Sequence, residues 1–442
     1  MSGHRRLLSQ SSFIFGGRLF GAGIVFLVQA LLARFWGAEY LGEFLLVTAT
    51  CNLIAVGMPL GFQTIGSYFA AEYRAKRERS QLGLFMLNAY GYVGLTTLLL
   101  MIAGPTVLGA LNLRDTVLFD HFVPVVLLAF SGAMVMVSGS MLVGLKRPFV
   151  GFFADGVFRP IVLLAALLLA MGVTTKSDGF SQLLWTAAIG YVLIAIVQLG
   201  FVLHAMKSVS NEDGALRPRD SRRWWRFALP WVMISLASDF FFDIDLLLLS
   251  QVLSREELAI FGVCARIFAL VSFGVAAVYA VSMPDMFESE AKADRAAFNR
   301  KVGDANMVAT VLSVVLFIGT AICAPFALLI FGPGFTAGAA PLAVLCLSLV
   351  IRSAMGPASL VLSIHDRPYA SLPAVLLSVV VLFVGNWLLA PTFGLMGAAL
   401  AALIAITVWS FALWLTAYRT AKVDVSIMQW FRTRRLAALP AE

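Results

Sequence analysis

The chain has 442 residues, of which 60% are hydrophobic and only 13% are charged, and its mean hydropathy is +0.91. A soluble domain is usually about half apolar and about a quarter charged, so this composition excludes an ordinary soluble protein. The apolar runs reach about 20 residues, the length of a membrane-spanning helix, and not the short alternating strands of a β-barrel. The formal net charge of +8 suits a membrane surface, and no feature calls for nucleic acid as a partner.

The first apolar segment follows the basic pair Arg5–Arg6 near the N-terminus. No short apolar core with a small-residue cleavage site occurs there, so residues 13–34 are expected to form an uncleaved span and not a signal peptide. The further predicted spans cover residues 41–70, 82–111, 120–144, 150–172, 183–206, 226–253, 257–286, 302–331, 338–364, 370–390 and 393–418. The sequence therefore predicts an all-α polytopic membrane protein with about twelve transmembrane helices.

The basic residues indicate how these spans are oriented. Most of the 32 Lys and Arg residues lie in the two tails or in every second connection between the predicted spans. Cytoplasmic connections are the ones enriched in Lys and Arg, so both chain termini are expected in the cytoplasm. The pair Trp224–Trp225 lies beside Arg222, Arg223 and Arg226 and is expected to anchor the chain at the membrane interface.

The two halves of the chain carry similar landmarks. The stretch GPTVLGAL, starting at Gly104, is followed by LKRPF, and APFALLIFG, starting at Ala324, is followed by HDRPY at the same distance. Several landmarks share an offset of about 220 residues, which indicates a duplication. Each half holds an even number of spans, so the two copies keep the same membrane orientation. The predicted domains are an N-terminal six-helix bundle (1–206), a cytoplasmic linker (207–225), a C-terminal six-helix bundle (226–418) and a basic cytoplasmic tail (419–442).

The connections and scattered reactive residues argue against an enzyme. The loops expected outside the cell are short, whereas a membrane-embedded glycan polymerase carries its catalytic groups on sizeable loops. The sequence has no GxxxxGK[ST] phosphate-binding loop, and its four histidines and four cysteines show no metal-ligand spacing. We therefore expect no enzymatic activity, no cofactor and no metal, and the function predicted is transport.

Four arginines fall within predicted spans, where an uncompensated charge is costly. They are Arg18, Arg159, Arg266 and Arg352. At a rise of ~1.5 Å per residue, the last three lie near the middle of a hydrocarbon core about 30 Å thick, and the first is shallower. Intramembrane charges usually face a water-filled cavity, and guanidinium groups match phosphate oxygens. The pattern predicts a cationic cavity between the two bundles and an anionic, phosphorylated substrate.

Four aspartates accompany these arginines. Asp155 precedes Arg159 by one helical turn, so the two can form a structural ion pair. Asp239, Asp243 and Asp245 lie in the segment LASDFFFDIDLLLLS. If this segment is one helix, the first two share a face, and one of them is expected to bind a proton unless an arginine neutralises it. Proton coupling and a static salt bridge both remain open as their role.

Three longer stretches carry a family resemblance. They are LLARFWGAEYLGEFLLVTA and YFAAEYRAKRE in the first half, and FALPW…DIDLLLLSQVLSREELAIFGVCARI in the second. On these stretches the chain resembles the multidrug/oligosaccharidyl-lipid/polysaccharide exporter superfamily, and within it the polysaccharide transporters that flip lipid-linked oligosaccharides. Asp245 and Arg266 match the acidic and basic positions of the family pattern, and Arg18 matches a cavity-lining arginine of related lipid flippases. The resemblance implies that Asp245 pairs with a basic residue such as Arg266.

The resemblance further implies a flippase of the bacterial cytoplasmic (inner) membrane. It would move a polyprenyl-pyrophosphate-linked oligosaccharide by alternating access, for the synthesis of O-antigen, capsule or exopolysaccharide. The four arginines would hold the pyrophosphate head, and the four aspartates would serve in ion coupling or gating. The expected partners are the lipid-linked anionic glycan, membrane lipids, and a polysaccharide polymerase with its chain-length regulator. The alternative is a cation-coupled drug or small-metabolite exporter of the same superfamily, which would need an acidic cavity.

Overall fold

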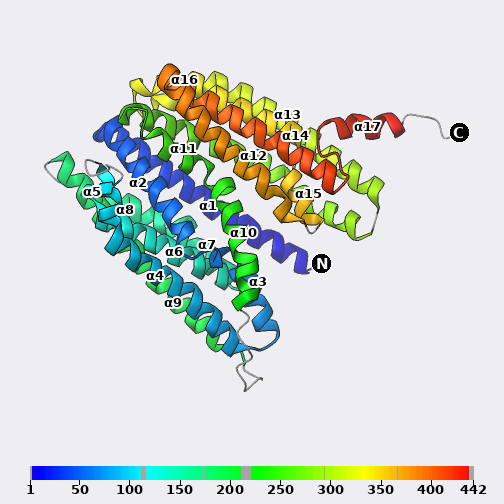
Figure 1. The fold of residues 1–442 in the computed structure, drawn as a ribbon, viewed down its shortest axis with the longest axis horizontal. Coiled ribbons are helices and arrows are strands. Elements are labelled where there is room, and N and C mark those ends of the chain that lie inside the picture. The colour runs from blue at the N-terminus through cyan, green and yellow to red at the C-terminus, as the bar shows by residue number, and fades with distance from the viewer. Residues whose placement is uncertain are drawn as a thin grey trace. The chain divides into compact units, whose positions relative to one another are not determined.

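The computed structural model describes residues 2–110, 116–172, 175–210, 221–292, 294–365 and 367–437. These residues form helices joined by short turns (Figure 1). Ten segments of the described chain are helical, long and apolar enough to cross a membrane. The longest of these segments, Pro368–Thr420, contains two predicted spans. A further helical region, residues 221–249, is interrupted near its middle and corresponds to one more predicted span. The prediction of an all-α protein with about twelve spans is therefore confirmed.

The chain divides into two compact units, Met1–Leu236 and Ala237–Glu442. The division lies inside helix α10 (Ser221–Asp239), later than residue 226, where the second bundle is expected to begin. Residues 211–220, the middle of the expected linker, lie outside the described part of the chain. Each unit is therefore described by itself below.

Unit 1 is built around one central helix, α6 (Phe122–Gly144). The surrounding elements are α1 (Ser2–Phe35), α2 (Ala38–Gly57), α3 (Phe62–Ala75), α4 (Arg79–Ala110), α5 (Val117–Asp120), α7 (Pro148–Phe153), a π-helix (Ala154–Phe158), α8 (Arg159–Ala170) and α9 (Lys176–Lys207). Helix α6 packs against α2, α3, α4 and α9. It is apolar on nearly all sides and most of its residues are buried, as expected for a helix at the centre of a bundle.

The predicted span 41–70 is broken into α2 and α3 at a glycine. Gly61 has φ +91°, and a Cβ there would lie 2.3 Å from the carbonyl oxygen of Ala228 in α10. Only glycine adopts this backbone conformation easily and also lets α10 approach so closely. The break is therefore set by the packing of α10 on unit 1.

Unit 2 contains the last part of α10 and the remaining helices. They are α11 (Phe241–Leu249), α12 (Arg255–Ala291), α13 (Arg295–Leu329), α14 (Ala339–Met355), α15 (Ala358–Ile364), α16 (Leu372–Thr420) and α17 (Met428–Ala437), with 3-10 turns at Pro333–Gly338 and Pro368–Ser371. Helix α12 begins with a capping box between Ser254 and Glu257. Helix α16 is continuous except at Gly394 (φ 55°, ψ −132°), which separates the predicted spans 370–390 and 393–418.

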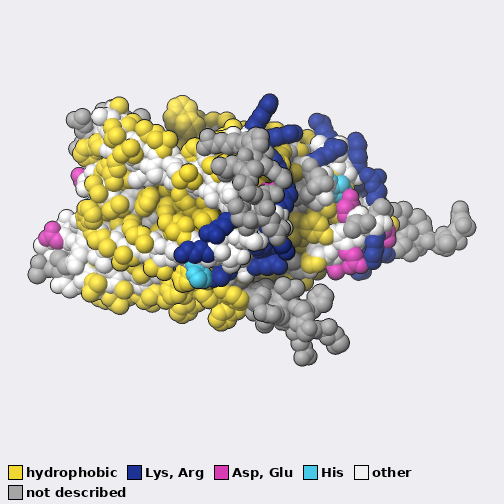
Figure 2. All heavy atoms as spheres, turned by 90° about the horizontal axis from the view of Figure 1, so that it is seen from below, with side chains coloured by type: hydrophobic (Ala, Val, Ile, Leu, Met, Phe, Trp, Pro, Cys, Tyr) yellow, Lys and Arg dark blue, Asp and Glu magenta, His cyan; other side chains and the backbone are white. Residues whose placement is uncertain are grey.

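Charged side chains are distributed unevenly on the face of the molecule that Figure 2 shows. Figure 2 shows Lys and Arg side chains gathered in a band beside an extensive hydrophobic surface that is nearly free of charge. Such a distribution is typical of a protein whose apolar helices lie in lipid and whose basic ends lie at a membrane surface.

Candidate functional site

Arg159 lies in unit 1 directly after a π-helical turn. Its Nη1 donates a hydrogen bond to Oδ1 of Asp155 at 2.7 Å, so the predicted ion pair is present. The guanidinium lies over the ring of Tyr191 in α9, 4.3 Å from its centroid. The side chain of Arg159 is only 16% exposed, whereas that of Asp155 is 61% exposed. The π-turn, a feature frequent at functional sites, therefore holds a largely buried arginine beside an acid that is open to its surroundings.

Arg18 of α1 lies against the same π-turn. A Cβ at Gly21 would fall 1.8 Å from the carbonyl oxygen of Gly156, so α1 and the π-turn touch backbone to backbone. Arg18 is exposed and its guanidinium lies over the ring of Phe152, 4.5 Å from the centroid. The glycines at positions 21 and 156 thus bring Arg18 close to the π-turn that Arg159 directly follows.

In unit 2 the acidic segment is not one helix. Phe240 leaves the helical conformation (φ −114°, ψ 23°), so Asp239 ends α10 and Asp243 lies in the first turn of α11. The expectation that these two carboxylates share one helix face is therefore wrong. The new helix starts where Phe241 stacks on Trp409 of α16, with centroids 6.1 Å apart, and this contact is invisible to a pattern of local residues.

Asp243 and Asp245 have different partners from the expected ones. Oδ1 of Asp243 lies 3.5 Å from Nη2 of Arg266, and Oδ1 of Asp245 accepts a hydrogen bond of 2.6 Å from Nδ2 of Asn386 in α16. The expected pairing of Asp245 with Arg266 is thus wrong, and Asp243 takes that place. Residues two apart point in different directions from a helix, so one aspartate turns toward α12 and the other toward α16.

The contact between Asp245 and Asn386 leaves two polar atoms unsatisfied. Both side chains are buried, and neither Oδ2 of Asp245 nor Oδ1 of Asn386 has a hydrogen-bond partner within the described structure. A buried carboxylate without a compensating charge is costly. A proton or a small monovalent cation bound at these oxygens would remove that cost. Asn386 was missed by the sequence reasoning, although a lone Asn within the apolar run FVGNWLLA signals it.

Arg352 occupies the last turn of α14, just before the chain turns at Gly356. Its guanidinium lies over the ring of Trp409, 5.1 Å from the centroid, and Asp239 acts on it electrostatically. Trp409 is buried and its Nε1 has no hydrogen-bond partner in the described structure. Each unit therefore carries two of the four intramembrane arginines, and an aromatic ring supports three of them, namely Arg18, Arg159 and Arg352.

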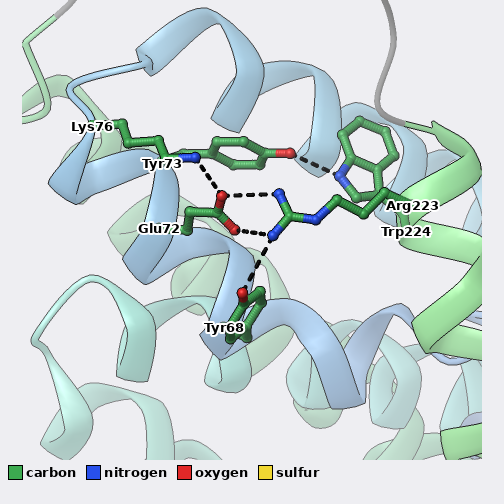
Figure 3. Close-up of polar contacts among 6 residues, drawn as sticks. All are labelled: Tyr68, Glu72, Tyr73, Lys76, Arg223 and Trp224. Carbon is green, nitrogen blue, oxygen red and sulfur yellow. Dashed lines mark hydrogen bonds and ion pairs between the residues drawn. The ribbon is translucent and has the colours of Figure 1, made fainter.

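Outside the predicted spans, a polar cluster fastens the start of α10 to α3 (Figure 3). Arg223 donates to both carboxylate oxygens of Glu72, each at 2.9 Å, and Lys76 adds a third bond of 2.6 Å. The bonds from Arg223, followed by those from Lys76, lower the pKa of Glu72. Nε1 of Trp224 donates to the hydroxyl of Tyr73 at 2.8 Å. Trp224 is completely buried, so the expectation that it anchors the chain in the membrane interface is wrong.

Comparison with known proteins identifies the fold. Neither a protein-family model nor a curated protein sequence matches the chain. A multidrug resistance MATE family transporter of the MOP superfamily, inward-facing, matches with TM-score 0.69 and 14% identity over 95% of this chain and 96% of that chain. The lipid II flippase MurJ, inward closed, matches with TM-score 0.70 and 12% identity over 97% of this chain and 94% of that chain.

A third structure belongs to a MOP superfamily transporter from Pyrococcus furiosus that is described as having a binding pocket of reversed polarity. It matches with TM-score 0.59 and 12% identity over 96% of this chain and 95% of that chain. Identities this low establish architecture and not substrate. The chain therefore has the two-lobe repeat fold of the MOP superfamily transporters.

Proposed function

We propose that this protein is a membrane transporter, not an enzyme, and that it flips a polyprenyl-pyrophosphate-linked oligosaccharide across the bacterial cytoplasmic membrane. The observation that carries this proposal is the setting of Arg352. Its guanidinium is supported by the face of Trp409, an arrangement that leaves the N–H edge of the guanidinium available to a phosphate. Arg159 over Tyr191 repeats this arrangement in unit 1. In each unit, an arginine held in this way suits a phosphate group of the proposed substrate.

The balance of charges favours this substrate over the alternative of a cationic drug. Structures with this fold include a lipid II flippase and multidrug transporters, so the fold itself leaves both open. A carrier of cations needs an acidic site, but the carboxylate of Asp155 in unit 1 is already bound by Arg159. The four intramembrane arginines favour an anion.

An apolar cavity in unit 1 is compatible with a lipid-linked substrate. It has a volume of about 480 Å³ and lies among α2, α4, α5 and α6, with Leu99, Val107 and Phe122 in its wall. Its wall is almost entirely hydrocarbon, so it suits a prenyl chain and offers little to a polar metabolite.

Coupling to an ion gradient is proposed to occur at Asp245 and Asn386. Loading of a proton or a monovalent cation would satisfy the two unpartnered oxygens, and unloading would leave a buried charge that favours a different packing of the helices. Asp155 and Asp243 form ion pairs with Arg159 and Arg266, and Asp239 acts electrostatically on Arg352, so a role in gating is proposed for these three aspartates.

The test is substitution of the arginines. In a strain that lacks its own copy of the gene, Arg352→Ala or Arg159→Ala should abolish surface polysaccharide while membrane protein levels stay normal. Arg352→Lys should rescue only in part, because a lysine has no bidentate fork. Arg295→Ala, at an exposed position at the start of α13, is the matched control and should have no effect. Full complementation by a variant with all four intramembrane arginines replaced by Ala would exclude the proposal.

A further inference from the structure

The C-terminal segment is an integral part of unit 2. Residues 421–427, here called the strap, leave α16 and cross the chain turn that follows α14. The amide of Ile427 donates to the carbonyl of Ala354 at 2.8 Å, and Nδ2 of Asn306 donates to the carbonyl of Val425 at 3.0 Å. A Cβ at Gly356 (φ +83°) would lie 1.8 Å from that same carbonyl oxygen. The strap is therefore held in one position by the bundle beneath it.

A buried carboxylate then fixes the direction in which the next helix leaves the strap. Asp424 accepts hydrogen bonds from Nε1 of Trp414 at 3.0 Å, from the hydroxyl of Ser426 at 2.7 Å and from Nη1 of Arg432 at 2.8 Å. Because Arg432 belongs to α17, this network ties the helix to the strap and to α16. The rotation of α17 about its own axis is thereby set.

One side of α17 is buried against α13 (Figure 1). Gln429 is buried, and a Cβ at Gly303 of α13 would lie 3.1 Å from the backbone nitrogen of Trp430. The glycine lets the backbone of α17 lie directly on α13. The opposite side of α17 must then point away from unit 2.

That opposite side, here called the outward face, consists of two large apolar side chains between two arginines. Met428 is 57% exposed and Phe431 is 46% exposed. At 100° per residue, Arg432 and Arg434 lie on either side of them. Arg432 remains 63% exposed although it bonds to Asp424, and Arg434 extends over the ring of Trp430, 4.4 Å from its centroid. An apolar centre with basic edges is characteristic of helices that lie in a membrane interface.

We propose that α17 is an interfacial helix and that its outward face binds anionic lipid headgroups at the cytoplasmic surface of the membrane. The charge of the face matches such lipids. Its position matches as well, because α13, on which it rests, begins with the exposed residues Arg295 and Arg300. The inference does not depend on the transported substrate. It requires only that the C-terminus is cytoplasmic, as the distribution of basic residues predicts.

The experiment measures lipid contact in the intact protein. Met428→Cys is made in a Cys323→Ala background, because Cys323 is exposed and the other three cysteines are buried. The new thiol carries a fluorophore, and the protein is reconstituted into vesicles of phosphatidylcholine and phosphatidylglycerol in equal parts, with bromine on the chains of one lipid at a time. Brominated phosphatidylglycerol should quench the label more strongly than brominated phosphatidylcholine. This preference should fall about fivefold in Arg434→Gln and persist in Arg434→Lys.

Two controls make the outcome decisive. A label on Lys292→Cys, whose exposed position ends α12, should show little quenching by either lipid. Arg434→Gln keeps the bond between Asp424 and Arg432, so loss of preference in that variant cannot come from detachment of α17. Equal quenching by the two lipids, or no quenching at position 428, would overturn the proposal. If the label at position 428 is shielded in cells but not in purified vesicles, a protein partner covers the outward face. That result would also overturn the proposal.

Discussion

The two units hold the acidic side chains of their predicted membrane spans in different ways. In unit 1 the acid and the arginine come from a single helical region, Asp155 and Arg159, and the acid is well exposed. In unit 2 the acids Asp243 and Asp245 are buried and bond to side chains of other helices. A pair on one helix survives when helices move relative to one another, whereas contacts between helices break or form. The comparison predicts that the buried acid Asp245 of unit 2, and not Asp155 of unit 1, responds to ion loading.

The largest effect is expected from Asp245→Asn. The amide keeps the size of the side chain but can neither take up a proton nor attract a cation. Transport in vesicles should lose its dependence on the ion gradient and fall by about tenfold or more. Asp155→Asn is the matched change in unit 1 and should preserve the gradient dependence. If both variants keep the gradient dependence of the wild type, the functional contrast between the units is wrong.

Removal of an acid from the contact between α11 and α12 should cost stability. Asp243→Ala leaves the one-third-exposed Arg266 without its acid, which should destabilise the protein by about 3 kcal/mol. Thermal unfolding of the purified protein would measure this loss. The double variant with Arg266→Leu should recover most of it, because the uncompensated charge is removed. Asp155→Ala should cost less, since Arg159 keeps the ring of Tyr191. Equal losses of stability in Asp243→Ala and Asp155→Ala would contradict the proposed difference between the two units.

A pair of glycine substitutions tests the contact between α1 and the π-turn in unit 1. Gly21→Ala places a methyl group 1.8 Å from the carbonyl oxygen of Gly156, so α1 and the π-turn must separate. We expect a loss of about 2 kcal/mol in unfolding free energy together with weaker transport. Gly23→Ala, two residues further along α1, has no atom within 4 Å and should be neutral. A neutral Gly21→Ala would mean that this helix contact is unimportant.

The smallest effect concerns the attachment of α10 to unit 1. The pKa of Glu72 is lowered by the hydrogen bonds from Arg223, so its contribution to stability is complete above the ordinary pKa of a glutamate, about 4.3. It is lost as the pH falls through the lowered value in the folded protein. The contribution should be about 1 kcal/mol or less, because the pair is partly exposed. The melting temperature of Glu72→Gln should be slightly below that of the wild type at neutral pH and should converge with it in acid. A difference that grows on acidification would refute the assignment.

Much of the architecture follows from the sequence alone. Hydropathy and length determine that the helices span a membrane, since a helix crossing about 30 Å of hydrocarbon needs about 20 apolar residues. The even number of spans per half predicts that the two halves have the same orientation. Counting residues along a helix predicts the membrane depth of Arg159, Arg266 and Arg352. These properties are local or additive along the chain, so no knowledge of packing is needed.

The tertiary structure decided which groups meet. The partner of Asp245 is Asn386, 141 positions away, and Arg266 meets Asp243 instead. The break at Phe240 and the burial of Trp224 against Tyr73 also arise from contacts between distant segments. A repeating pattern limits which face of a helix is polar, but a rotation of a few tens of degrees exchanges one neighbour for another. That rotation is set by side-chain volumes on all adjoining helices together, and the linear sequence does not display which helices adjoin.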